Sequence, residues 1–211
     1  MRQRYVSALA VLAIALLAPM AMAQQDHSTS AKDGRAVATF AGGCFWCMEP
    51  PYDELDGVTS TISGYTGGTK ADPSYQEVSQ GGTGHTEAVQ ITYDPDKLTY
   101  EKLLEVFWRN VDPLDAGGQF CDRGDQYRTG IFVHDEEQRR LAEQSKQALE
   151  DNQRFEGQSI VTEIEEAGPF FPAEDYHQDY YEKNAIRYKF YRWNCGRDQR
   201  LAEVWGAEAT H

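Results

Sequence analysis

The segment AVATFAGGCFWCME, residues 36–49, decides how the rest of the chain is interpreted. Its first six residues form a short apolar run and two glycines follow, which is typical of a buried strand that ends in a tight turn. A helix is expected to begin near Cys44 and to run toward Leu55, although Pro50 and Pro51 fit badly inside a helix. The segment therefore predicts a strand, a turn and a helix that begins with a cysteine.

Further strands and helices are expected downstream of this segment. Strands are predicted within residues 58–65, 87–93, 129–133 and 160–164, and helices at 99–111 and 135–151, the first capped by Thr99. Residues 71–84 and 112–125 are expected to be loops, and the chain from Pro169 onward to be irregular. The order strand, helix, strand, strand, helix, strand predicts an α/β (α+β) protein. Its core would be a ferredoxin-like, two-layer split βαβ unit with an irregular C-terminal extension.

The N-terminus has the pattern of a targeting segment. Arg2 and Arg4 precede an apolar run at residues 6–18, and Ala-Met-Ala at 21–23 fits the small residues that precede a cleavage site. The run is short for a bilayer span, which favours a secretory signal peptide cleaved after Ala23 over an uncleaved anchor. Residues 24–34 are expected to be a flexible lead-in and residues 35–211 a single domain, in the periplasm or secreted.

The chain is strongly acidic. Its formal net charge is −14, and removal of residues 1–23 with their two arginines takes it to −16. Such a charge argues against binding to nucleic acid or to anionic membranes, and it favours solubility. No long heptad repeat is present, and a monomer is expected.

The chemistry is expected to centre on Cys44. Free N–H groups and the dipole at the start of a helix stabilise a thiolate, so the pKa of Cys44 is expected to be lowered and its sulfur to be nucleophilic. A buried structural cysteine or a simple Cys44–Cys47 bridge is the plainer alternative. The C-x-x-C spacing directly after a strand and a turn shifts the balance toward redox chemistry.

A family resemblance rests on motifs along nearly the whole chain. They are GGCFWCMEP, SGYTGG, PSYQEVSQGGTGHTEAV, YDP, FWRNVDP, DRGDQYRTGIF, FPAEDYHQDYYEKN and GRD. With these motifs, the chain resembles the A-type peptide methionine sulfoxide reductases from about Thr39 to Trp205. GCFW and GHTEAV at this separation form a highly specific combination. The resemblance implies a reductase domain that converts methionine-S-sulfoxide, in proteins and as the free amino acid, to methionine.

The resemblance also implies roles for individual residues. Cys44 would attack the sulfoxide sulfur and become a sulfenic acid. Glu87 would protonate the leaving oxygen, which requires a raised pKa. Tyr75 and Tyr127 would donate hydrogen bonds to the sulfoxide oxygen, and Asp122 would organise the polar side of the pocket.

Aromatic residues and further cysteines complete the implied site. Phe45 and Trp46 would form the wall that holds the substrate methyl group. A second thiol would condense with the sulfenic acid, and a thioredoxin-like donor would reduce the resulting disulfide without any bound cofactor or metal. Cys195 and Cys47 are close rivals for this resolving role and Cys121 ranks third. A non-catalytic bridge among them is also open in an oxidising compartment.

Three other functions compete with this one. A thioredoxin-like thiol–disulfide oxidoreductase would explain Cys44 and Cys47, but it would leave GHTEAV and DRGDQYRTG unused. A metal-binding module is disfavoured because the chain has a single C-x-x-C pair and only five histidines. A non-enzymatic domain that binds peptides through its aromatic residues would not need Cys44.

Overall fold

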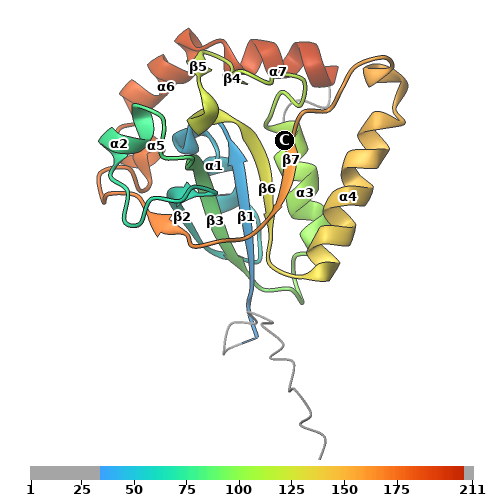
Figure 1. Ribbon diagram of the computed structural model, residues 1–211, viewed down its shortest axis with the longest axis horizontal. Helices are drawn as coiled ribbons and strands as arrows, with labels where there is room; N and C mark the ends of the chain where they lie inside the picture. The colour runs from blue at the N-terminus through green and yellow to red at the C-terminus, as the bar shows by residue number, and fades with distance from the viewer. Residues whose placement is uncertain (1–33, 207–211) are drawn as a thin grey trace, which may run out of the picture.

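The computed structural model describes residues 34–206, which form a mixed sheet of six strands with helices packed around it (Figure 1). The strand order is β7-β6-β1-β3-β2-β8, in which β6 and β7 are parallel and every other pair is antiparallel. The strands are β1 (Ala36–Gly42), β2 (Val58–Thr66), β3 (Thr86–Tyr93), β6 (Thr129–Val133), β7 (Glu163–Glu166) and β8 (Phe171–Pro172). The predicted α/β class is confirmed; the ferredoxin-like plan remains a prediction that describes the four inner strands, β6-β1-β3-β2.

Seven helices and three short 3-10 turns lie within residues 34–206. The helices are α1 (Pro50–Asp53), α2 (Tyr75–Ser79), α3 (Tyr100–Arg109), α4 (Glu136–Glu150), α5 (Tyr180–Lys183), α6 (Ala185–Asn194) and α7 (Arg197–Trp205). The 3-10 turns are η1 (Phe45–Cys47), η2 (Asp125–Tyr127) and η3 (Gln153–Phe155), and a small hairpin joins β4 (Gly118–Gln119) to β5 (Asp122–Arg123). None of these helices is long and apolar enough to cross a bilayer.

Local capping explains why α3 and α4 begin where the sequence predicts. The Thr99 side chain accepts a hydrogen bond from the Lys102 N–H at the start of α3, and Asp135 accepts one from the Gln138 N–H at the start of α4. Helix α3 packs against β1 and α4 with a face that includes Leu103, which is fully buried. These contacts bury the main hydrophobic core on one side of the sheet.

Before the C-terminal extension, the sequence prediction differs from the structure at four places. The loop expected at 112–125 contains the β4–β5 hairpin. The helix expected from Cys44 to Leu55 is only the 3-10 turn η1 followed by the single turn α1, because Pro50 and Pro51 occupy the first positions of α1 and cannot continue a preceding helix. The expected loop at 71–84 contains α2, which is held by a capping box between Ser74 and Glu77. The strand expected at 160–164 lies three residues later, as β7.

The C-terminal extension is helical, so the prediction of an irregular extension is wrong. Helix α6 buries Tyr188 on its inner side, but Ile186, Phe190 and Trp193 are exposed on its outer side. Because large apolar side chains lie on both sides of α6, its sequence lacks the polar and apolar alternation by which a surface helix is normally detected.

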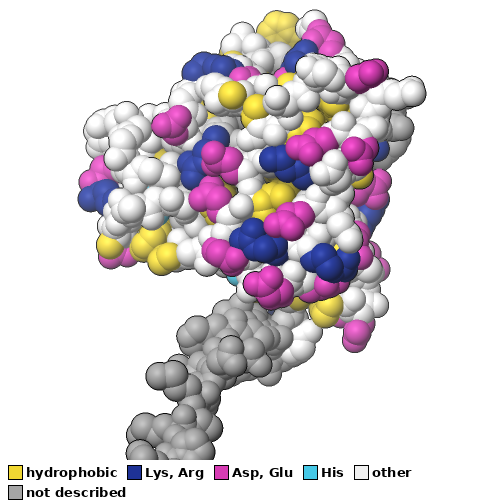
Figure 2. Space-filling model, turned by 45° about the vertical axis from the view of Figure 1, so that its right-hand side comes forward, with side chains coloured by type: hydrophobic (Ala, Val, Ile, Leu, Met, Phe, Trp, Pro, Cys, Tyr) yellow, Lys and Arg dark blue, Asp and Glu magenta, His cyan; other side chains and the backbone are white. Residues whose placement is uncertain are grey.

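On the face shown in Figure 2, acidic and basic side chains are interleaved rather than forming one continuous acidic field. The acidic side chains of β7 pair with arginines: Glu163 and Glu165 with Arg128, and Glu166 with Arg139 of the neighbouring α4. These ion pairs are mostly exposed and therefore contribute little to stability, about 0–1 kcal/mol each. The predicted signal peptide and nearly all of the lead-in lie outside the described residues.

The end of β1 directs the chain toward the functional region. The arrowhead of β1 in Figure 1 points to the end of the sheet where β4, β5, α6 and α7 gather. Cys44 follows this strand directly, after Gly42 and Gly43. Only glycine fits Gly42, because a Cβ there would lie 2.6 Å from the Met48 sulfur, and Gly43 has a φ of +80°.

Candidate active site

A small pocket of about 60 Å³ opens at this end of the sheet. Eight residues from six segments line it: Cys44, Phe45, Trp46, Tyr75, Glu87, Asp122, Tyr127 and Tyr191. The first three follow β1, and the others come from α2, β3, β5, η2 and α6. The structure thus brings together seven of the nine site residues that the sequence suggests. Cys47 and Cys195 do not line the pocket.

Cys44 carries its proton in the free protein. Burial raises the pKa of the Cys44 thiol well above its usual value, and its hydrogen bond to Cys47 and the charge of Glu87 raise it further. The expectation of a lowered pKa at Cys44 is therefore wrong. The expected helix is replaced by a three-residue 3-10 turn, whose small dipole does not offset the burial of a charged sulfur.

Cys47 is the more acidic thiol of the buried cysteine pair. The hydrogen bond from Cys44 and the positive charges of Arg197 and Arg192 lower the pKa of Cys47 to about 6, although burial opposes this shift. Cys47 is 1% exposed and packs against Tyr180 and Tyr188. The pair therefore holds one proton between two sulfurs at neutral pH.

Glu87 is a buried acid at the start of β3. Burial raises the pKa of Glu87 to about 8, and the charge of Asp122 also raises it, whereas a hydrogen bond from the Phe45 N–H at 3.1 Å opposes the rise. At neutral pH the carboxyl group therefore keeps its proton while it faces the same pocket as Cys44. A neutral carboxyl group in this position is able to donate a proton.

Three tyrosines line the pocket, and each keeps its hydroxyl proton at neutral pH. Burial raises the pKa of Tyr75 to about 12, and it raises the pKa values of Tyr127 and Tyr191 further. Tyr191 donates a short hydrogen bond to Asp122, whose own pKa is raised by burial. The polar side of the pocket thus combines hydroxyl donors with a carboxylate that orients one of them.

The aromatic side of the pocket is held by stacking. The Trp46 ring stacks on Tyr180 with a centroid distance of 3.7 Å and an interplanar angle of 8°. Its Nε1–H donates to Nδ1 of His177 at 3.0 Å, and burial lowers the pKa of His177, which keeps that nitrogen free to accept. His177 also packs against Phe45 and Tyr75. It therefore supports the walls of the pocket from behind.

The chain matches known proteins over most of its length. The profile of the family "Peptide methionine sulfoxide reductase" matches residues 36–209. A peptide methionine sulfoxide reductase MsrA of Bacillus licheniformis is 56% identical over 172 residues, which cover 82% of this chain and 94% of the relative. The chain belongs to the peptide methionine sulfoxide reductase A family.

Solved structures agree with this assignment. Mxr1 from Saccharomyces cerevisiae in its reduced form has a TM-score of 0.67 and 32% identity, and the match covers 72% of this chain and 87% of that one. Mxr1 in complex with Trx2 matches with a TM-score of 0.50 and 25% identity, over 70% of this chain and 85% of that one.

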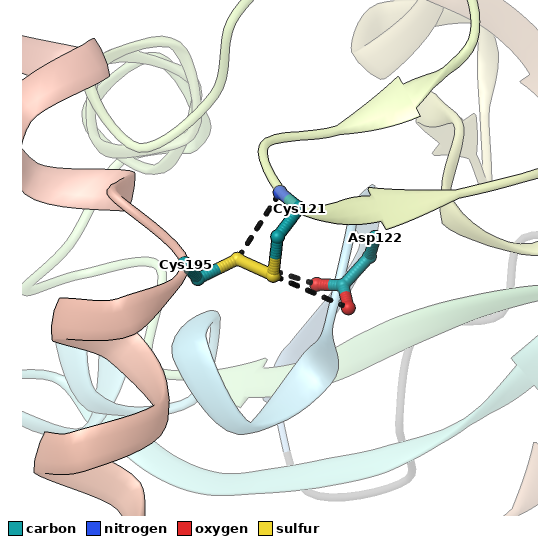
Figure 3. Close-up of side chains that lie close together, drawn as sticks. All are labelled: Cys121, Asp122 and Cys195. Carbon is teal, nitrogen blue, oxygen red and sulfur yellow. Dashed lines mark hydrogen bonds between the residues drawn. A yellow bond between two sulfur atoms is a disulfide. The ribbon is translucent and has the colours of Figure 1, made fainter.

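The four cysteines of this reductase form two separate pairs. Cys44 and Cys47 are free and buried, whereas Cys121 and Cys195 form a disulfide with a Cα–Cα distance of 4.9 Å. Figure 3 shows that this disulfide links the turn between β4 and β5 to the C-terminal end of α6, with the Asp122 carboxylate beside it. Cys121, Asp122 and Cys195 also have the proximity of a metal site, but the bonded sulfurs offer no thiolate ligands.

Sequence reasoning missed three residues of the site region. Tyr191 lies in the segment that was expected to be irregular. Glu174 fixes Tyr75 by accepting its backbone N–H at 2.9 Å, and it also accepts the Tyr65 hydroxyl. Arg197 is buried and donates to the backbone oxygens of Gly42 and Asn110, which braces the turn in front of Cys44. Glu174 and Arg197 both lie in motifs that carry the family resemblance, FPAEDYHQDYYEKN and GRD.

Proposed function

We propose that this protein reduces methionine-S-sulfoxide, in polypeptides and as the free amino acid, by thiol chemistry at Cys44. The observation that carries the proposal is one shared pocket in which the Cys44 thiol and the protonated Glu87 carboxyl meet, with tyrosine hydroxyls beside them. A sulfoxide oxygen is a strong hydrogen-bond acceptor, so Tyr75 and Tyr127 orient it. The aromatic rings of Phe45 and Trp46 contact the methyl group.

The first step transfers oxygen from substrate to enzyme. The Cys44 sulfur attacks the sulfoxide sulfur while Glu87 gives its proton to the oxygen, and the Cys44 proton moves along its hydrogen bond to Cys47. The S–O bond of the substrate breaks and a sulfenic acid forms on Cys44. The substrate sulfur gains two electrons, Cys44 loses two, and methionine leaves.

The second step forms a disulfide. The Cys47 sulfur attacks the Cys44 sulfenic acid, so that a Cys44–Cys47 bond forms and water leaves. Cys47 suits this role because its thiol is free and is hydrogen-bonded to Cys44, whereas Cys195 is bonded to Cys121. A dithiol protein of the thioredoxin type then reduces the new disulfide; the yeast structure of Mxr1 with Trx2 supports such a donor.

The decisive experiment uses the two epimers of a methionine sulfoxide peptide with dithiothreitol as reductant. We expect the S epimer to be reduced by the wild-type protein, the R epimer to remain, and Cys44→Ser to be inactive on both. Turnover of the R epimer, or turnover that survives in Cys44→Ser, would overturn the proposal. A thioredoxin-like oxidoreductase would instead reduce protein disulfides and would not need Glu87.

We also propose that the protein is exported after removal of residues 1–23, which leaves residues 35–211 as one catalytic domain behind a short lead-in. The support is the arginine pair, the short apolar run and the Ala-Met-Ala sequence. The test is intact mass and N-terminal sequencing of the protein from fractionated bacterial cells. We expect a chain that begins at Gln24 in the periplasmic or extracellular fraction; a full-length chain in the cytoplasm would contradict export.

A further inference from the structure

Helix α6 carries a row of large apolar side chains on its outer face. Ile186, Phe190 and Trp193 are 87%, 65% and 74% exposed, and their spacing of four and three residues places them on one side of the helix. The rings of Phe190 and Trp193 lie 6.1 Å apart. Contiguous exposed apolar surface of this kind marks sites where other molecules bind.

A groove runs along part of this face. It has a volume of about 590 Å³ and is lined by Trp46, Tyr180, Ile186, Arg187, Phe190 and Tyr191. Two of these residues, Trp46 and Tyr191, also line the catalytic pocket. The groove therefore begins where the pocket ends, and the two share a wall.

The pocket is too small to hold more of a polypeptide substrate than one side chain. A volume of about 60 Å³ accommodates the end of one methionine side chain, so the backbone and the neighbouring residues of a polypeptide substrate remain outside. Methionine is mostly buried among apolar residues in folded proteins. An unfolded, oxidised segment therefore presents apolar side chains beside its sulfoxide, and the adjoining groove offers apolar surface to them.

We propose that this groove is the binding site for the polypeptide that flanks the oxidised methionine, with an apolar neighbour of the methionine packed on Ile186 and Phe190. The inference rests on the proposed function and adds to it a class of substrate: unfolded segments in which the oxidised methionine has apolar neighbours. Trp46 contacts the sulfoxide methyl on one side and borders the groove on the other. Arg187 is the charged residue of the groove, and it places a cation beside the bound chain.

The test compares three substrates in the presence of dithiothreitol. They are N-acetyl-methionine-S-sulfoxide amide, a peptide with leucine and phenylalanine beside the sulfoxide, and a peptide with serine in both places. We expect wild-type kcat/KM to be about tenfold higher on the apolar peptide than on the other two substrates. Partial burial of one or two apolar side chains in the groove accounts for an increase of this size. In the double variant Ile186→Ser, Phe190→Ser the ratio of apolar peptide to small amide should fall close to one.

Trp193→Ser provides the matched control. Trp193 is an equally exposed aromatic residue on the same helix face, but it does not line the groove. We expect this variant to keep the wild-type ratio. Because each variant is judged by a ratio of two substrates, a general loss of activity or folding does not mimic the expected result.

Several outcomes would overturn the inference. One is a wild-type enzyme without preference for the apolar peptide, and another is a double variant that keeps the preference. A third is a dimer in sedimentation velocity that the double variant dissociates, which would make the groove an interface between two copies. A fourth is a double variant whose KM for a thioredoxin-like reductant is raised while its ratio of apolar peptide to small amide is unchanged, which would make the groove a binding site for the reductant. By contrast, an inactive wild type on the small amide would refute the proposed function itself.

Discussion

The two cysteine pairs of this reductase have opposite surroundings. Cys44 and Cys47 lie three positions apart in sequence, are buried and remain free thiols, and a buried acid and two arginines influence their pKa values. Cys121 and Cys195 are separated by 74 positions and form a disulfide at the surface, beside Asp122. Only the first pair has a hydrogen bond between its two sulfurs, along which the Cys44 proton can pass to Cys47 when Cys44 attacks.

The second pair has a different consequence for the molecule. A disulfide between distant residues restricts the unfolded chain, and the restriction grows with the length of the closed loop. This disulfide also joins the turn directly before Asp122 to the end of the helix that carries Tyr191. In the proposed mechanism, one pair performs the chemistry, and the other holds two residues of the pocket in place.

The largest expected effect comes from removal of Cys47, the thiol to which we assign the resolving role. Cys47→Ser should stop multiple turnover when a thioredoxin, its reductase and NADPH are the reductants, because the Cys44 sulfenic acid has no partner thiol. The variant should still release about one methionine per enzyme because Cys44 and Glu87 remain, but more slowly, because the Cys44 proton has lost its acceptor. Rapid-quench measurement of this burst, followed by mass mapping of the disulfides, tests the prediction. Sustained turnover in Cys47→Ser together with its loss in Cys195→Ser would assign the resolving role to Cys195.

The second largest effect is expected from the loss of Glu87, the buried acid beside the Cys44–Cys47 pair. Glu87→Gln should lower the single-turnover rate about 10²- to 10⁴-fold, because an amide cannot protonate the leaving oxygen. In the wild type, the pKa of Glu87 is about 8, so the rate should fall as the pH rises above 8 and the proton is lost. This fall should be absent in Glu87→Gln.

Glu49 offers the matched control for that pH profile. It is a second buried carboxyl group whose pKa burial raises to about 7, and it does not line the pocket. Glu49→Gln should keep the fall above pH 8. A profile that flattens in Glu49→Gln, or that persists in Glu87→Gln, would remove Glu87 from the role of proton donor.

The third effect is expected from the loss of the Cys121–Cys195 disulfide, which should lower mainly the stability of the protein. The double variant Cys121→Ser, Cys195→Ser should lower the free energy of unfolding by about 2–4 kcal/mol in denaturant melts, as loss of a disulfide that closes a long loop does. Single turnover on a small sulfoxide should fall only a few-fold. A complete loss of thioredoxin-supported turnover with an intact burst would instead show that this pair carries electrons.

The sequence predicts the framework of this molecule better than its electrostatics. The capped helices, the inner strands and the pocket residues Cys44, Tyr75 and Glu87 follow from local patterns or from motifs. The pKa of Cys44 does not, because it depends first on burial by the whole fold, then on a hydrogen bond to Cys47 and on a buried carboxyl group from another strand. Helix α6 escapes detection because its outer face is apolar, and this is the face that we assign to polypeptide binding.

The smallest expected effect tests whether the exposed pair acts through Tyr191. Tyr191 and Asp122 lie 69 positions apart, so their hydrogen bond depends on the fold and on the disulfide beside it. Tyr191→Phe removes only the hydroxyl and should slow single turnover a few-fold, which corresponds to about 1 kcal/mol for one hydrogen bond. If the disulfide positions this pair, the same substitution should have a still smaller effect in the Cys121→Ser, Cys195→Ser background. Additive effects in this double-mutant cycle would show instead that the disulfide and Tyr191 act independently.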